Sequence, residues 1–128
     1  MDSFTVSAVF PGPPRRIYDA WISAEGHSAM TGAGATSDPR PGGLFTAWDG
    51  YIEGTFVELG PDRIVQTWRS TDFPEGAADS TLDVRFEAVK LGTRVAIVHS
   101  DIPPGQGPNY REGWEQFYFT PMRAHFSG

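Results

Sequence analysis

The feature that most constrains the fold is an aromatic-rich stretch near the C-terminus, residues 109–126, NYREGWEQFYFTPMRAHF. At about 100° per residue, one side of a helix built from this stretch is almost entirely apolar. That side carries Tyr110, Trp114, Phe117, Tyr118, Pro121 and Met122, and the opposite side carries Glu112, Gln116 and Arg123. The pattern predicts a long amphipathic helix with an unusually aromatic face. Such a face must be covered, and a sheet is the element that covers it most readily.

The rest of the chain predicts that sheet. Apolar and polar residues alternate over 4–10, 81–89 and 93–101, which is typical of half-buried strands. Further extended runs cover 44–48, 51–59 and 64–69. Short turns separate these runs and favour antiparallel hairpins over βαβ units. The pair Asp49-Gly50 predicts a two-residue hairpin turn, because both residue types tolerate positive φ.

Two short helices are predicted between the first strand and the remaining strands. Pro14 suits a first helical turn, and the apolar residues after it follow helical spacing, so we expect a helix over 14–23. A second helix is expected over 25–30 and should end at Gly32. The stretch 32–43 is a loop by composition. Its glycines do not form a dinucleotide-binding fingerprint, since a third glycine and a leading strand are missing.

Length and composition exclude several classes of protein. The chain has 128 residues, which predicts one domain spanning 1–128. It has no cysteine, which excludes disulfides and thiolate chemistry and is compatible with a reducing compartment. The net charge of −6 disfavours a nucleic-acid partner. Neither a signal-peptide pattern nor an apolar run of about 18 residues is present, so we expect a cytoplasmic protein with no membrane span.

Short motifs along nearly the whole chain carry a family resemblance. They are Ala20-Trp21, Pro41-Gly42-Gly43-Leu44-Phe45, Asp49-Gly50, the IVxxWR motif at 64–69, Gly92-Thr93, His99 with Pro103-Pro104, and Gly113-Trp114 with Tyr118-Phe119. Together they resemble the Hsp90 ATPase activator homologue family, C-terminal domain type, of the START/Bet v 1-like helix-grip (SRPBCC) superfamily. The sequence departs from the family at Met30-Thr31, where relatives often have an aromatic residue, and at Gln66, where they often have an aromatic or aliphatic residue.

The resemblance implies an α+β helix-grip fold. In that fold a curved antiparallel sheet of six or seven strands wraps around the long C-terminal helix, and two short helices follow the first strand. It also implies an Hsp90-type chaperone as a partner and a role in the stress response. Helix-grip folds commonly hold a cavity between the sheet and the helix, which is where a hydrophobic or amphipathic small molecule would bind.

The aromatic helix face therefore has two interpretations. It either closes the core or forms the roof of a cavity. If a cavity exists, its candidate ligand-binding residues are inward-facing aromatic and polar side chains: Trp21, Phe45, Phe56, Gln66, Trp68, Phe86, His99, Trp114, Phe117, Tyr118 and Pro121. Pro121 is also expected to kink the helix, because an internal proline costs about 3 kcal/mol.

No catalytic or metal-binding pattern stands out in the sequence. His27, His99 and His125 lack metal-ligand spacing, and the serines lie in no nucleophile elbow, so no metal, cofactor or catalytic residue is predicted. We expect His99 to be half-buried and hydrogen-bonded. A cyclase- or hydrolase-type enzyme stays a third alternative to a ligand-binding domain and a protein-interaction module. It would require a carboxylate or histidine of shifted pKa inside the cavity.

Two further surface features are predicted. Arg69 and Glu58 are expected to form a cross-strand ion pair. Trp48, Tyr51 and Phe73 lie in or beside predicted turns, where they have less core to join. They either pack locally or form an exposed patch for a homodimer or a chaperone.

Overall fold

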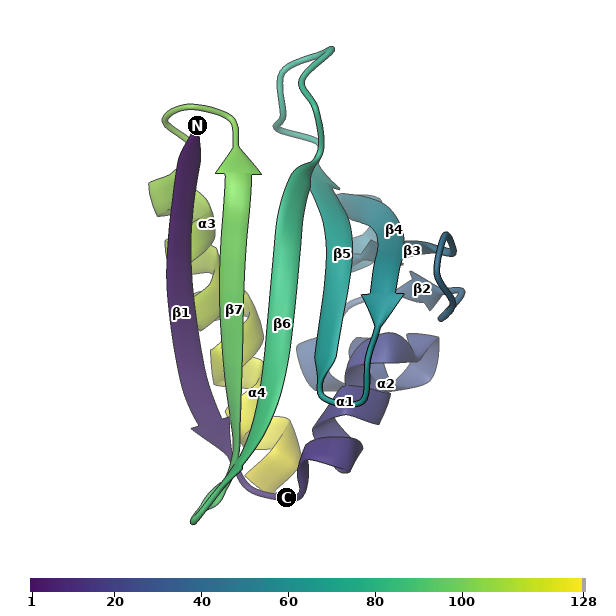
Figure 1. Ribbon diagram of the computed structural model, residues 1–128, viewed down its shortest axis with the longest axis vertical. Coiled ribbons are helices and arrows are strands. Elements are labelled where there is room, and N and C mark those ends of the chain that lie inside the picture. The colour runs from purple at the N-terminus through teal and green to yellow at the C-terminus, as the bar shows by residue number, and fades with distance from the viewer. Residues whose placement is uncertain (128) are drawn as a thin grey trace.

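The first strand and the C-terminal helix run alongside each other at one side of a curved antiparallel sheet (Figure 1). The computed structural model describes residues 1–127. Its elements are, in order, β1 (Asp2–Phe10), α1 (Pro14–Ile22), α2 (Ala24–Thr31), β2 (Thr36–Ser37), β3 (Leu44–Ala47), a 3₁₀ turn (Trp48–Gly50), β4 (Ile52–Leu59), β5 (Arg63–Ser70), β6 (Ser80–Val89), β7 (Gly92–Ile102), α3 (Gly107–Gly113), a π turn (Trp114–Phe119) and α4 (Thr120–Ser127).

The seven strands form one sheet in the order β1-β7-β6-β5-β4-β3-β2, with antiparallel pairing throughout. Helices α1 and α2 connect its two edges, β1 and β2, and the later strands then return one by one until β7 pairs with β1. All helices lie on one face of the sheet (Figure 1). The predicted α+β architecture, with two short helices after the first strand and a long C-terminal helix, is therefore confirmed. The short strand β2 lies within the stretch that was predicted to be loop.

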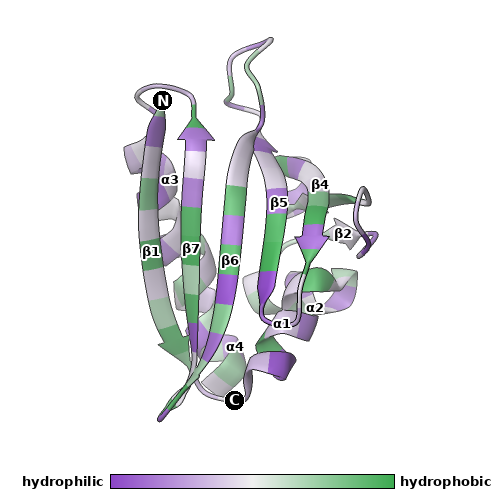
Figure 2. Cartoon of the chain, viewed as in Figure 1, coloured by the Kyte–Doolittle hydropathy of each residue, from purple (hydrophilic) through white to green (hydrophobic). Residues whose placement is uncertain are grey.

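The alternation in the sequence corresponds to the two faces of the sheet. On β6, Leu82, Val84 and Phe86 are buried, whereas Arg85 and Glu87 between and beyond them are exposed. Figure 2 shows the same alternation of hydrophobic and hydrophilic residues along the strands. The core therefore lies between the helices and the apolar face of the sheet, as expected for an antiparallel sheet with one face exposed to water.

The turn between β3 and β4 differs from the prediction. Ala47 pairs with Ile52, so the connection has four residues, 48–51, rather than the two expected. Trp48 and Asp49 both adopt positive φ, 52° and 57°. The predicted two-residue turn is wrong because Trp48 leaves the strand and enters the left-handed region together with Asp49. The side chain of Trp48 consequently belongs to the turn and not to β3.

The C-terminal helix starts at Gly107 and changes register midway. The N–H of Thr120 bonds to the carbonyl of Glu115, five residues back, which is the hydrogen bond of a π turn. The extra residue in this turn shifts the following side chains around the helix relative to an α-helix. Phe119 is therefore buried, while Phe117 is 50% exposed. The prediction that Phe117 faces the core is wrong for this reason.

Another prediction fails because of strand register. The β4–β5 hairpin places Arg69 opposite Glu53 and Glu58 opposite Val65. Arg69 pairs instead with Asp79 at 2.7 Å, while Glu58 lies 3.6 Å from Arg63. The predicted Arg69–Glu58 pair is therefore wrong.

Of the two interpretations given for Trp48, Tyr51 and Phe73, local packing holds for Phe73. It is only 7% exposed, because its ring packs against Trp68 and Tyr110. The loop after β5 packs against the start of α3, so the ring of Phe73 is buried among core aromatic residues.

Candidate functional site

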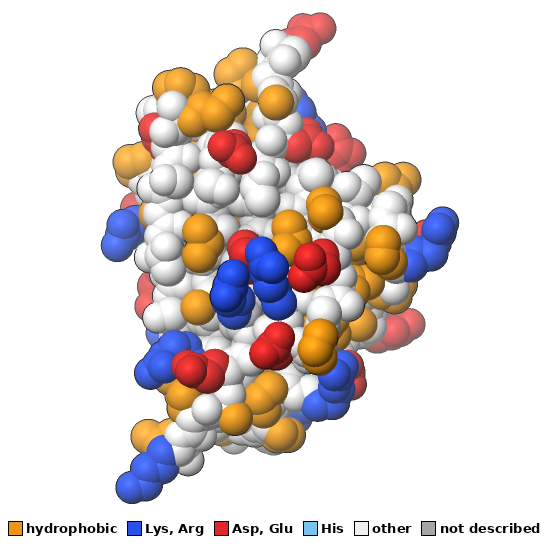
Figure 3. All heavy atoms as spheres, viewed as in Figure 1, with side chains coloured by type: hydrophobic (Ala, Val, Ile, Leu, Met, Phe, Trp, Pro, Cys, Tyr) orange, Lys and Arg blue, Asp and Glu red, His pale blue; other side chains and the backbone are white. Residues whose placement is uncertain are grey.

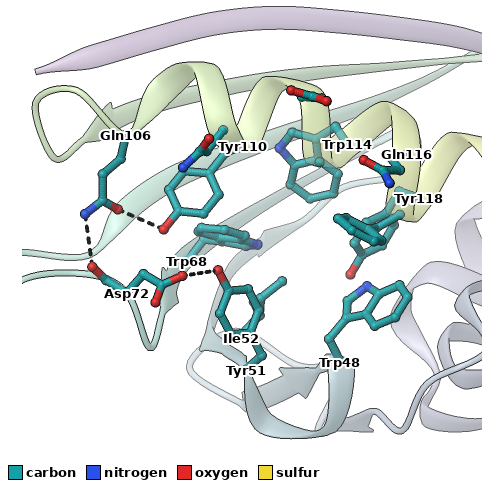
Figure 4. Close-up of a pocket in the computed structure, with 14 residues that line it drawn as sticks. Trp48, Tyr51, Ile52, Trp68, Asp72, Gln106, Tyr110, Trp114, Gln116 and Tyr118 are labelled. Atoms are coloured by element: carbon teal, nitrogen blue, oxygen red, sulfur yellow. Dashed lines mark hydrogen bonds between the residues drawn. The ribbon is translucent and has the colours of Figure 1, made fainter.

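An open cleft of about 680 Å³ lies between the first half of the C-terminal helix and the ends of strands β4 and β5 (Figure 4). The helix supplies one wall, and the β3–β4 turn with the end of β5 supplies the facing wall. Its lining residues are Trp48, Tyr51, Ile52, Trp68, Asp72, Gln106, Asn109, Tyr110, Glu112, Gly113, Trp114, Gln116, Phe117 and Tyr118. Half of these fourteen are aromatic, so the cleft offers flat apolar surfaces with polar groups at its rim.

Trp114 is the centre of the aromatic walls. Its ring lies 4.6 Å from that of Tyr118 and 6.0 Å from that of Trp68, measured between centroids. Across the cleft mouth, Trp48 packs edge-to-face against Phe117 at 5.6 Å. The aromatic surfaces therefore come from the helix, from β5 and from the β3–β4 turn, which lie far apart in the sequence.

A buried hydrogen-bond chain fixes Trp114 to the sheet. The indole Nε1–H of Trp114 donates to Nδ1 of His99 at 3.1 Å, so the proton of the neutral imidazole is on Nε2. That Nε2–H donates to Oγ of Ser80 at 2.9 Å, and the Ser80 hydroxyl donates to the carbonyl of Trp68. Burial lowers the pKa of His99 to about 3. His99 is thus a neutral structural group, and it is fully buried rather than half-buried as predicted.

A second buried histidine holds Tyr118. Nδ1 of His27 donates to the carbonyl of Trp21 at 2.9 Å, which leaves Nε2 to accept from the Tyr118 hydroxyl at 2.8 Å. The indole of Trp21 in turn donates to Oε1 of Gln66 at 3.0 Å. Burial lowers the pKa of His27 to about 4 and raises the pKa of Tyr118. Helix α2 and the C-terminal helix are therefore joined through uncharged partners.

One end of the cleft is closed by a polar network (Figure 4). The Tyr51 hydroxyl donates to the carboxylate of Asp72 at 2.6 Å, and the Tyr110 hydroxyl donates to Oε1 of Gln106 at 2.8 Å. Gln106 donates to the carbonyl of Asp72 at 3.0 Å, and Ser70 bonds to the Tyr110 hydroxyl. Burial and the bond to Asp72 raise the pKa of Tyr51 to about 12. The network ties the sheet end to α3.

The indole nitrogen of Trp48 has no hydrogen-bond partner, although it is shielded from solvent. Within residues 1–127 it is the only buried side-chain nitrogen or oxygen atom without a hydrogen-bond partner. An unmade hydrogen bond at a buried donor costs about 1–3 kcal/mol, so such a group needs an explanation.

Charge is distributed unequally between the cleft and the outer face of the sheet. Asp72 and Glu112 line the cleft, and its lining within residues 1–127 includes no arginine, lysine or histidine. On the outer face, arginines gather with acidic side chains (Figure 3). There Arg63 donates to Asp83 at 2.8 Å, and that hydrogen bond lowers the pKa of Asp83. The outer arginines are consequently neutralised by their neighbours.

The structure brings together only part of the predicted site. Trp68, Trp114, Phe117 and Tyr118 line the cleft. The other predicted residues lie outside its lining: Trp21, Phe45, Phe56, Gln66, Phe86 and His99 in the buried core, and Pro121 at the start of α4. A ligand-binding role for any of the eleven residues stays a prediction.

Sequence reasoning missed the polar side of the cleft. Gln116 and Glu112 were assigned to the solvent side of the helix, yet both line the cleft because it opens at the flank of the helix and not under its centre. Asp72 and Gln106 lie in loops, and no periodicity predicts their positions. The aromatic residues near turns were the available indication, since Trp48 and Tyr51 both line the cleft.

Neither a metal-binding cluster nor a membrane-spanning helix is found within residues 1–127. No group of three or more histidine and acidic side chains there is arranged to hold a metal ion. Nor does that part of the chain contain a helix long and apolar enough to cross a membrane.

Comparisons with known proteins agree with the fold. A sequence model of the family described as "Activator of Hsp90 ATPase homolog 1-like protein" matches residues 11–127. The chain is 30% identical over 123 residues to the human "Activator of 90 kDa heat shock protein ATPase homolog 1", covering 95% of this chain and 36% of the relative. The chain thus spans about a third of the length of the curated relatives it matches.

Solved structures extend the likeness over the whole domain. An HSP90 activator from Plasmodium falciparum superposes with a TM-score of 0.85 and 28% identity, covering 95% of this chain and 94% of that chain. Ara h 8.0201 superposes with a TM-score of 0.73 at 15% identity, covering 98% and 97% of the two chains, and shows the fold alone. The predicted helix-grip fold is confirmed.

Proposed function

The chain belongs to the family of Activator of Hsp90 ATPase homolog 1-like proteins, and we propose that its domain binds an apolar or amphipathic small molecule in the aromatic cleft. The observation that carries this proposal is a cleft of about 680 Å³ with seven aromatic residues among its fourteen lining residues. Small-molecule sites are typically about 300–1,000 Å³ and combine apolar walls with a few polar groups.

The stability of the cleft walls supports the same proposal. Trp114 and Tyr118 are held by buried histidines, and Tyr51 and Tyr110 are held by the polar network at the cleft end. Side chains fixed in this way do not need to be ordered when a ligand enters, so less entropy is lost on binding. The walls are preorganised around an open space.

Gly113 provides a sharp test, because it lines the cleft from within α3. A Cβ added there would meet only Cδ2 of Phe117, at 3.8 Å, which is ordinary contact. Gly113→Leu should fill the cleft without disturbing the helix, and Gly113→Ala is the matched control. Three of the four tryptophans line the cleft, so intrinsic fluorescence reports occupancy.

The experiment is a fluorescence titration of the three proteins with a panel of lipids and aromatic metabolites. We expect at least one saturable ligand for the unsubstituted protein and for Gly113→Ala, and a loss of more than about tenfold in affinity for Gly113→Leu. The proposal is refuted if no panel member binds the unsubstituted protein. It is also refuted if every ligand found binds all three proteins with equal affinity.

A second candidate function is stimulation of an Hsp90-type chaperone. It is favoured by the family match over residues 11–127 and by the likeness to the Plasmodium HSP90 activator. The test is the ATPase rate of a purified Hsp90-type chaperone with increasing amounts of this protein. A dose-dependent rise supports this function, and an unchanged rate together with no detectable binding by calorimetry rejects it.

A homodimer and a cytoplasmic location also stay proposals. The dimer was predicted from an aromatic patch that included Phe73, and Phe73 is buried, which weakens its basis. Sedimentation equilibrium over a range of protein concentrations measures the association state directly.

A further inference from the structure

Resting on the proposed ligand-binding function, we infer that the ligand is a flat, uncharged aromatic molecule with one hydrogen-bond acceptor, and that this acceptor takes the indole N–H of Trp48. Three properties of the cleft point to this ligand: an unpartnered donor, a turn that holds this donor in place, and walls whose charge selects against anions.

The indole donor of Trp48 differs from those of Trp21 and Trp114. The indoles of Trp21 and Trp114 donate to Gln66 and His99 at 3.0 and 3.1 Å. Nε1 of Trp48 is buried to the same degree as a core atom but has no acceptor within residues 1–127. An N–H withdrawn from water gains most from an acceptor brought by a ligand, because the group has already lost its hydration.

The turn holds Trp48 in place by several hydrogen bonds. The N–H of Asp49 donates to the carbonyl of Gly34 at 2.9 Å, and the N–H of Gly34 donates back to the Asp49 carboxylate at 2.8 Å. These bonds hold Trp48 and Asp49 at φ values of 52° and 57°, which non-glycine residues rarely adopt. Backbone strain that is maintained in this way concentrates at ligand sites.

Phe117 is the exposed aromatic neighbour of the Trp48 ring. It packs edge-to-face against Trp48 at 5.6 Å, and half of its side chain is exposed. Rotation of an exposed side chain is fast and needs no backbone movement. We infer that rotation of Phe117 toward solvent gives an acceptor in the cleft access to the indole N–H of Trp48.

The walls determine the rest of the ligand. Trp68, Tyr110 and Trp114 line the cleft with aromatic rings, and a flat aromatic molecule packs well against such rings. Asp72 and Glu112 repel an anion, and the lining within residues 1–127 has no basic group to compensate. A quaternary ammonium would be attracted to the same walls, but it has no lone pair for Trp48. A neutral carbonyl compound satisfies all three properties.

Four naphthalene probes test the inference by isothermal titration calorimetry: naphthalene, 2-acetylnaphthalene, 2-naphthoate and (2-naphthylmethyl)trimethylammonium. We expect 2-acetylnaphthalene to bind about five- to tenfold more tightly than naphthalene, the gain of one hydrogen bond. In Trp48→Phe, this preference should fall to about one, because phenylalanine has no N–H. The preference is the ratio of the two affinities within each protein, so a change in the affinity for naphthalene itself does not affect the test. Leu91→Ala, at an exposed residue outside the cleft lining, is the control that keeps the preference.

The outcomes separate the two proposals. Equal binding of naphthalene and 2-acetylnaphthalene, persistence of the preference in Trp48→Phe, or tightest binding of 2-naphthoate or the ammonium probe overturns this inference and leaves ligand binding intact. If none of the four probes binds and the lipid panel also fails, both proposals fall.

A second measurement needs no substituted protein. In a ¹H–¹⁵N correlation spectrum, 2-acetylnaphthalene should move the Trp48 indole proton downfield relative to its position with naphthalene. An unchanged Trp48 indole signal with a saturating amount of 2-acetylnaphthalene would contradict the inference.

Discussion

The indole N–H of Trp114 donates to Nδ1 of His99 at 3.1 Å, and this bond connects the C-terminal helix to strand β7 of the sheet. Because His99 also donates to Ser80, the imidazole is locked in one neutral tautomer between helix and strands. The wall of the cleft and the stability of the fold therefore depend on the same side chain.

Replacing His99 should destabilise the whole domain. His99→Phe keeps an aromatic ring but leaves the buried Trp114 N–H without an acceptor. We expect the free energy of unfolding to fall by about 2–3 kcal/mol, in urea denaturation followed by fluorescence. His125→Phe is the matched control, because His125 is exposed, and it should change stability by less than about 0.5 kcal/mol. A similarly small effect of His99→Phe would show that the bond is unimportant.

Mild acid should destabilise the protein through its two buried histidines. The folded-state pKa values of His99 and His27 are about 3 and about 4, below the unfolded value of 6.5. Below pH 6.5 the unfolded state binds more protons than the folded state, so stability is lost as pH falls from 6.5 toward 4. Each histidine contributes a slope of about 1.4 kcal/mol per pH unit in this window.

Urea denaturation at several pH values measures this slope. His27→Gln should remove about half of it. A free energy of unfolding that stays constant between pH 6.5 and 4.5 would mean that neither histidine is held neutral by the fold.

The tyrosines should resist ionisation at alkaline pH. Burial raises the pKa of all four, Tyr18, Tyr51, Tyr110 and Tyr118, and Tyr51 reaches about 12 through its added bond to Asp72. Near pH 10 about half of the tyrosines in denatured protein are ionised. The native protein should show well under half of that tyrosinate absorbance. Since the unfolded state loses these protons first, the free energy of unfolding should decline above pH 10. Equal tyrosinate absorbance of native and denatured protein near pH 10 would mean that the fold does not raise the tyrosine pKa values.

Filling the cleft should separate ligand binding from stability. Gly113 has helical dihedral angles, so Gly113→Ala should raise the free energy of unfolding by about 0.5–1 kcal/mol in thermal or urea denaturation. Gly113→Leu should be as stable as the unsubstituted protein while it loses ligand affinity. A large loss of stability in Gly113→Ala would indicate that the space beside Gly113 is already occupied.

Sequence periodicity was sufficient for the fold but not for the cleft. Alternation in β6 and β7 and the aromatic stretch at 109–126 identify the sheet face and the covering helix, because burial follows the period of each element. The position of Phe117 could not be predicted, since a π turn is a local choice of hydrogen bond that leaves no period in the sequence. Trp48 and Asp72 depend on a turn and a loop end, whose conformations arise from tertiary contacts.

The most direct measurement of the central claim is a crystal structure of the protein with a saturating ligand from the fluorescence panel. The account predicts ligand density in the cleft, in contact with Trp48, Trp68 and Trp114. Density bound elsewhere, such as at the arginine-lined outer face of the sheet, with the cleft holding only water, would contradict it.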